Sequence, residues 1–173
     1  MRRATYWGLL CCFTLEWLAL AVWIGGMAVL VGAVIPAVFN TFGGQDSGGL
    51  FLTRAFEGYH RFVIGAMAVL CAGSIYRLWS GEPAGAVGRG EIVVLALMVT
   101  FAGVVIFTLH PQAAILQAQA FAAQDDTAKK AAFESLFRVL IPIRVLDIVN
   151  LVLGILLIGM KSKRTLCPGG PAL

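Results

Sequence analysis

Four long apolar stretches run along the sequence, and more polar segments separate them. They extend from Trp17 to Phe39, from Phe62 to Trp79, from Ile92 to Leu109 and from Val139 to Met160. Each approaches or exceeds the roughly 17–25 residues with which a helix crosses a bilayer. We therefore predict an all-α integral membrane four-helix bundle, with helices at about residues 15–38, 59–79, 91–110 and 138–160.

The composition supports a membrane protein. Hydrophobic residues make up 60% of the 173 residues and charged residues only 13%, whereas soluble domains are about 45–50% apolar and about 25% charged. We predict a single membrane domain over residues 1–173, with residues 161–173 as a cytoplasmic tail. The net charge of +4 comes from basic residues beside the apolar stretches, so we expect the lipid bilayer as a partner and no nucleic acid.

Basic residues also predict the orientation. Arg2 and Arg3 precede the first stretch, and the segment KSKR at 161–164 follows the last one. Four crossings place both ends of the chain on one side, and the positive-inside rule makes that side cytoplasmic. We expect a multi-pass protein of the cell (inner) membrane with both termini in the cytoplasm.

One short phrase occurs twice. AFEGYHRFVI at 55–64 and AFESLFRVLI at 132–141 lie 77 positions apart. The same offset places Gly26 on Gly103, and we interpret the chain as two helical hairpins that are parallel repeats. Such repeats are related by a pseudo-two-fold axis along the membrane normal.

Small residues predict where the helices approach closely. Helices in lipid associate largely through close backbone packing, which small side chains permit. We therefore expect packing positions in three of the helices, at Gly25, Gly26, Pro36, Gly103 and Gly154.

Polar residues converge at one end of the predicted bundle. Because ionisable residues at membrane depth usually face the bundle interior or a wet cavity, we predict a polar pocket on the outer side. Its residues would be Glu57, His60, Arg61, His110, Arg144, Asp147 and Asn150. Arg144 and Asp147 would neutralise each other, either as a structural ion pair or as part of an open pocket.

The chain has two histidines, and two hypotheses stay open for them. His60 and His110 on facing helices could ligate a b-type haem or another metal ion. Alternatively, each is an interfacial residue with a hydrogen-bonded neighbour. Near the opposite end, Glu16 is expected at the interface, or as a partner of Arg77 or Arg2.

Four motifs in order carry a family resemblance. They are VWIGGMAVLVGAVIPAVF in the first helix, FEGYHRF, LHPQAAILQ and FESLFRVL. With them the chain resembles the transmembrane protein 205-like family (domain of unknown function 4149) over roughly residues 13–160. The resemblance implies a four-helix membrane domain, linked in some members to drug or metal tolerance. Where the last motif of the family usually has a histidine, this chain has Phe137.

The sequence contains no nucleophile–base set and no phosphate-binding loop, so we expect no enzymatic activity. The first functional hypothesis is small-solute or metal transport, or tolerance to either, through the outer-side pocket. The alternatives are a redox module that binds haem b or another tetrapyrrole, and an accessory subunit of a larger membrane complex. A four-helix chain of this size also leads us to expect a homo-oligomer or a membrane complex.

Overall fold

A computed structural model describes residues 3–42, 46–82, 85–123 and 125–166. The described residues contain helices and turns and no strand. The helices join into four rods. The first rod comprises α1 (Arg3–Leu20), η1 (Ala21–Gly25), α2 (Gly26–Val29), η2 (Leu30–Val34) and α3 (Ile35–Phe42). The second is α4 (Asp46–Ser80), the third comprises α5 (Arg89–Val104), η4 (Val105–Leu109) and α6 (His110–Ala122), and the fourth is α7 (Asp126–Leu166).

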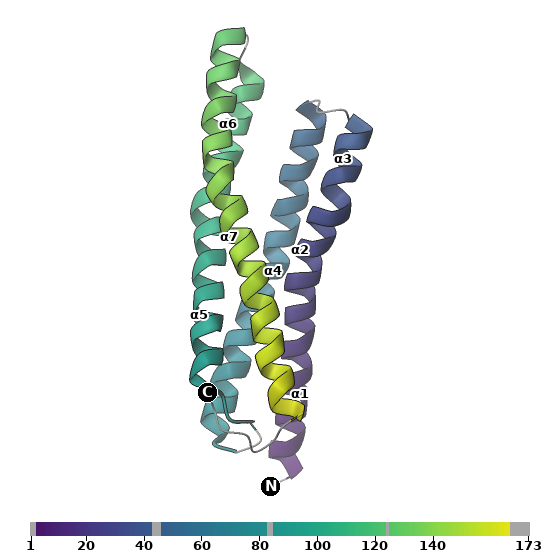
Figure 1. Cartoon of the computed structure of the whole chain (residues 1–173), viewed down its shortest axis with the longest axis vertical. Coiled ribbons are helices and arrows are strands. Elements are labelled where there is room, and N and C mark those ends of the chain that lie inside the picture. Colours follow the sequence, from purple (N-terminus) through teal and green to yellow (C-terminus); the bar gives the residue numbers. More distant parts are fainter. Residues whose placement is uncertain (1–2, 43–45, 83–84, 124, 167–173) are drawn as a thin grey trace.

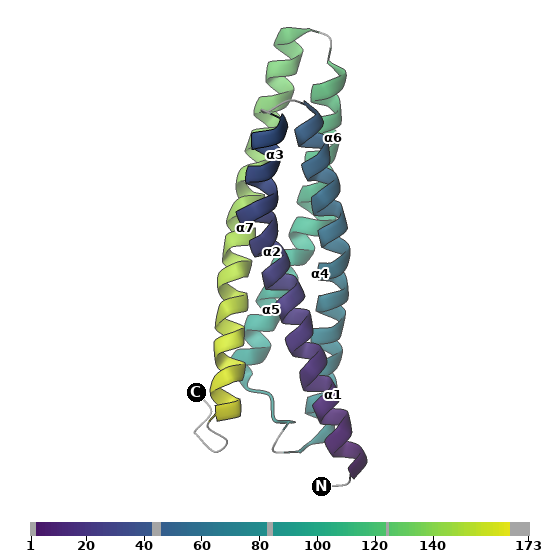
Figure 2. The same ribbon diagram turned by 90° about the vertical axis from the view of Figure 1, so that its right-hand side faces the viewer.

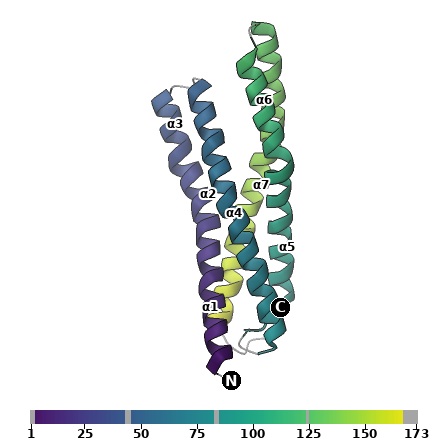
Figure 3. The same cartoon turned by 180° about the vertical axis from the view of Figure 1, so that it is seen from behind.

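The rods form two hairpins that lie side by side (Figure 1). The rod of α1–α3 packs with α4, and the rod of α5–α6 packs with α7. We call the end where α1 begins and α7 ends the base, and the opposite end the tips. In Figure 2 the middle of the rod of α1–α3 lies between α7 and α4, and from behind α3 and α6 lie far apart at the tips (Figure 3).

The four rods confirm the predicted membrane helices. Each is long and apolar enough to cross a membrane, within residues 5–42, 47–80, 89–122 and 127–163. Every rod contains its predicted helix and continues beyond it. The predicted tail does not begin at residue 161, because α7 continues to Leu166 and Lys161 is buried inside the bundle.

The core is apolar through the middle of the bundle. Each rod contributes a large apolar side chain with at most 1% of its surface exposed: Leu20, Leu70, Met98 and Leu157. Large apolar side chains also cover the outside; Phe62 and Phe107, for example, are each 66% exposed. An apolar exterior around an apolar core fits a bilayer as the surrounding solvent.

The repeated phrase lies in the second and fourth rods, and the first and third rods also resemble each other. In each, a π-helical turn is followed by a proline, at Leu30–Val34 with Pro36 and at Val105–Leu109 with Pro111. These turns correspond at an offset of 75, not 77. The offsets differ because the second hairpin is extended: its α6–α7 tip reaches beyond the α3–α4 tip (Figure 1).

The four glycines predicted as packing positions divide into two groups. A Cβ atom at Gly26 would lie 2.8 Å from Cε2 of Tyr59, and one at Gly154 would collide with Ile24. These two glycines therefore permit the predicted close packing. At Gly25 and Gly103 a Cβ would meet nothing within 4 Å, so the prediction was wrong there. Pro36 is exposed and follows a π-helical turn, where it shapes the helix and does not pack.

Candidate functional site

His60 on α4 and His110 at the start of α6 meet between the two hairpins. Their ring centroids lie 4.6 Å apart and their planes are nearly perpendicular, at 85°. His60 is buried, with 8% of its surface exposed, and His110 is half-buried. The predicted meeting of the two histidines on facing helices therefore occurs in this structure.

Two residues of α7 face the histidine pair. Asp147 and Asn150 line the same cavity as His60, whereas Arg144 is exposed on the outside. The predicted neutralisation of Asp147 by Arg144 is therefore wrong. A step of three residues falls about 60° short of a full helical turn, so Arg144 is rotated by about 120° from Asn150 and lies on another face.

The remaining predicted pocket residues lie elsewhere. Arg61 is exposed. Glu57 accepts a hydrogen bond of 3.1 Å from Arg54, whose side chain is 83% exposed. Glu57 and Arg61 were thus wrongly assigned to the pocket, because the interior face of α4 at this level carries Tyr59, His60 and Val63.

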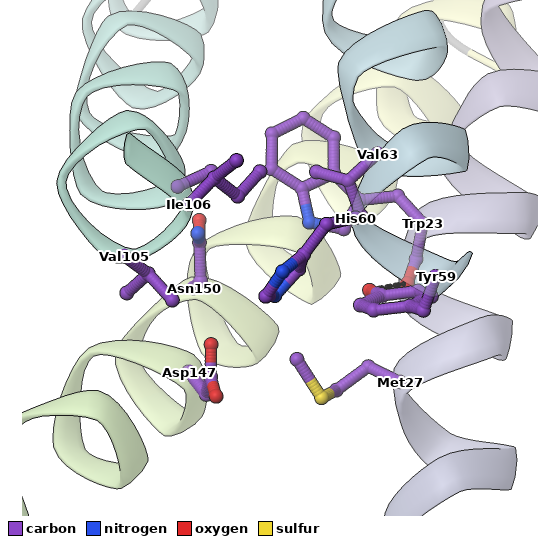
Figure 4. Close-up of a pocket in the computed structure, with 10 residues that line it drawn as sticks. Trp23, Met27, Tyr59, His60, Val63, Val105, Ile106, Asp147 and Asn150 are labelled. Carbon is purple, nitrogen blue, oxygen red and sulfur yellow. Dashed lines mark hydrogen bonds between the residues drawn. The ribbon is translucent and has the colours of Figure 1, made fainter. Parts of the chain in front are cut away.

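The cavity lies where all four rods meet. Its volume is about 10 Å³, which is roughly the space for one water molecule. Figure 4 shows His60 between the polar side chains of α7 and the aromatic side chains of the first hairpin. The cavity is lined by Trp23, Met27, Tyr59, His60, Val63, Ala102, Val105, Ile106, Asp147 and Asn150.

Two π-helical turns border the cavity. Trp23 belongs to η1, and its carbonyl oxygen accepts a hydrogen bond of 2.7 Å from the Tyr59 hydroxyl. Val105 is the first residue of η4, and η4 ends directly before His110. Single π-helical turns inside α-helices are frequently found at functional sites, and here they bring side chains of the first and third rods to the cavity.

The geometry does not fit a haem. With metal–nitrogen bonds of about 2 Å, two imidazoles on opposite sides of one iron have ring centres about 6 Å apart. The observed 4.6 Å is shorter, and the cavity leaves no room for a macrocycle. Within the described ranges, no three His, Cys, Asp or Glu side chains are grouped so as to hold a metal ion.

A second polar cluster, which we call the charge ring, lies at the base. It contains one buried charge from each rod: Glu16, Arg77, Glu91 and Lys161, which are 0%, 2%, 3% and 6% exposed. Arg77 donates hydrogen bonds of 2.8 Å to each of the two glutamates. The Lys161 ammonium lies 2.5 Å from Glu16 and 2.7 Å from Glu91. Each charge thus contacts two opposite charges, and the charges balance.

Neighbouring residues give the charge ring space and further polar contacts. Gly73 makes room for Glu16, since a Cβ at that position would lie 2.6 Å from its Oε1. The guanidinium of Arg77 lies 4.6 Å from the centre of the Phe13 ring. Arg77 also donates to the carbonyl oxygens of Gly85 (3.2 Å) and Ala86 (3.4 Å) in the loop before α5. Such additional partners are needed to offset the cost of burying charges.

The two polar clusters lie far apart along the bundle. Residues 91 to 110 of the third rod cover about 28 Å at a rise of about 1.5 Å per residue, close to the roughly 30 Å of a hydrocarbon layer. The charge ring and the histidine pair therefore lie near opposite edges of that layer, with the apolar core between them.

Sequence reasoning found only part of the charge ring. It proposed Arg77 as one partner of Glu16, but it assigned Lys161 to the tail and did not single out Glu91. Glu16 and Glu91 each precede a proline by the same interval, at Pro36 and Pro111. Aligning the first and third rods on these prolines would have paired the two glutamates.

Fold and polar clusters together define a multi-pass, four-helix membrane protein with buried polar groups near both edges of the bilayer. Residues 18–122, more than half of the chain, match the domain of unknown function DUF4149, and the chain belongs to that family. Comparison with curated proteins and with solved structures gives no significant match. The match covers the first three motifs and supports the DUF4149 part of the resemblance, but not the likeness to transmembrane protein 205; FESLFRVL lies outside the matched residues.

Proposed function

We propose that this protein is a non-enzymatic membrane protein that binds a small solute in the cavity between its hairpins and transports it. The observation that carries the proposal is the cavity itself. It lies between the two hairpins near one edge of the hydrocarbon layer, and His60, Asp147 and Asn150 line it. Polar groups at this depth are costly, which favours a functional role over a packing role.

The rest of the bundle supports a closed state of a transporter. On the base side of the cavity lie the apolar residues of the core, and beyond them the charge ring links the two hairpins through Arg77–Glu91 and Lys161–Glu16. Toward the tips, α3 and α7 diverge (Figure 1). Solute would reach the cavity from the tips, and release at the base would require the charge ring to open.

Orientation and assembly complete the proposal. The basic residues next to the first and last apolar stretches favour a cytoplasmic base by the positive-inside rule, and with that orientation the cavity would face the outer side. Four helices surround little polar volume, which also leads us to propose a homo-oligomer or a place in a membrane complex. Tolerance to the solute would require the same route to run in reverse, from the base through the charge ring to the cavity and out between the tips.

The test is flux through liposomes that contain the purified protein. Uptake of sodium, ammonium, zinc and glycerol would be measured for the wild type and for Asp147→Asn. We expect one of these probes to enter faster than into protein-free liposomes, and Asp147→Asn to remove the difference. The matched control is Asp125→Asn, because Asp125 is exposed in the turn before α7. Equal rates with and without protein for all four probes would overturn the proposal.

A further inference from the structure

We infer that the cavity binds a single small monovalent cation that donates hydrogen bonds, of the size of ammonium. This inference rests on the proposed site, because it names the class of solute that the cavity takes. It depends on three features of the lining: an acceptor oxygen without a partner, a carboxylate without a neighbouring cation, and aromatic faces.

The unpartnered acceptor is Asn150. Its side chain lies in the bundle interior with only 4% of the residue exposed, and its Oδ1 atom is buried without a hydrogen-bond partner among the residues that the structure describes. Leaving a buried polar atom unpaired costs about 1–3 kcal/mol, and native structures rarely tolerate it. Because Asn150 lines the cavity, a donor placed there would satisfy this atom.

The charge of the lining selects a cation. Asp147 is the one residue of the cavity lining with a formal charge, and the nearest basic residue along α7, Arg144, is exposed. A buried carboxylate is stable only when a positive charge or donors accompany it. A cation in the cavity would supply the charge that Arg144 does not.

The other polar and aromatic groups favour a cation with N–H donors. The Tyr59 hydroxyl donates its proton to the Trp23 carbonyl at 2.7 Å, so toward the cavity its oxygen can only accept. The imidazole of His60 lines the cavity, and a neutral imidazole keeps one acceptor nitrogen. The rings of Trp23 and Tyr59 add aromatic faces, which attract ammonium groups.

The size and number of ligands exclude larger and multiply charged ions. A cavity of about 10 Å³ holds one group of the size of water, so an alkylated amine does not fit. Divalent calcium and magnesium require about six or more oxygen ligands. In the part of the chain that the structure describes, no trio of His, Cys, Asp or Glu forms a transition-metal site.

The experiment measures the unfolding temperature of the purified full chain in mild detergent by tryptophan fluorescence. Ammonium, sodium, potassium and N-methylglucamine chlorides are titrated at constant ionic strength. We expect a saturable rise of several degrees with ammonium alone, since a ligand that binds only the folded state stabilises it. The rise should disappear in Asp147→Asn and in Asn150→Leu, and it should persist in Asp125→Asn.

Each result supports or overturns the assignment of an ammonium-sized cation. A rise with sodium or potassium but not with ammonium would overturn the assignment of an N–H donor, and equal curves in all four salts would leave a cavity for water only. These arms use the wild type, so they decide even if a variant does not fold. Ammonium binding without flux in liposomes would refute the proposed transport and keep this inference. Flux of glycerol without a cation-specific rise would do the reverse.

Discussion

Glu16 and Lys161, on the first and last rods, lie 2.5 Å apart at the base of the bundle. Together with the Arg77–Glu91 ion pair, this contact joins one hairpin to the other. The remaining two contacts of the charge ring, Arg77–Glu16 and Lys161–Glu91, lie within the hairpins. The charge ring therefore connects the two hairpins to each other and also connects the two rods within each hairpin.

The first prediction removes one charge of the ring. Lys161→Met should lower the free energy of unfolding by about 3–5 kcal/mol, because two buried glutamates then share one arginine. Thermal or denaturant unfolding in detergent measures the loss. Lys163→Met is the matched control, since Lys163 is exposed two positions further along α7. Equal stability of the two variants would show that the charge ring does not hold the hairpins together.

The second prediction tests whether the ring acts as a unit. Glu16→Gln and Lys161→Met should each destabilise the protein, but the double variant should lose less than the sum of the two. The reason is that Arg77 and Glu91 remain paired at 2.8 Å and the charges balance again. A coupling energy of about 0.5–3 kcal/mol is expected from the double-mutant cycle. Additive losses would mean that the two side chains act independently.

The architecture was predictable because the hydropathy of the sequence alone indicates how many helices cross the membrane. Only helices of sufficient length satisfy every backbone group in lipid, so four apolar stretches lead to four rods. Their full length was less predictable. Gln117, for example, is polar and lowers the hydropathy of its segment. Its side chain nevertheless accepts a hydrogen bond from Thr53 where α6 and α4 continue past the predicted helices.

The polar clusters were harder to predict because helical spacing fixes a face only approximately. Asp147, Asn150 and the two histidines were predicted to share a pocket; His60, Asp147 and Asn150 line one cavity and His110 contacts His60, but Arg144, predicted with them, is exposed. Lys161 was misassigned for another reason. A lysine after an apolar stretch usually lies in the headgroup region, and only its contacts with Glu16 and Glu91 turn it inward.

The third prediction concerns the space that Gly73 leaves for Glu16. In Gly73→Ala the new Cβ would lie 2.6 Å from the carboxylate, which should cost about 1–3 kcal/mol of stability through overpacking. Gly65→Ala is the control on the same helix, because nothing lies within 4 Å of its added Cβ. That variant should be slightly more stable, by about 0.5–1 kcal/mol. Unfolding of both variants in the same detergent measures the difference; stabilisation in both would contradict the packing.

The fourth prediction concerns the wall of the cavity. Tyr59→Phe removes the hydrogen bond to the Trp23 carbonyl and should reduce stability by about 1 kcal/mol. Tyr6→Phe serves as the control, since Tyr6 is 53% exposed near the base. Thermal unfolding compares the two variants with the wild type. If Tyr59→Phe unfolds like Tyr6→Phe, the hydrogen bond does not hold α4 against η1.

The last prediction distinguishes the small-solute cavity from the redox hypothesis. Protein purified gently from its native membrane should show no Soret band, because the rings of His60 and His110 lie 4.6 Å apart at 85°. That contact leaves no place for an iron between them. The absorption spectrum is measured together with that of His60→Ala. A Soret band that disappears in the variant would mean that the helices separate to admit a tetrapyrrole, and it would replace the transport proposal with an electron-transfer function.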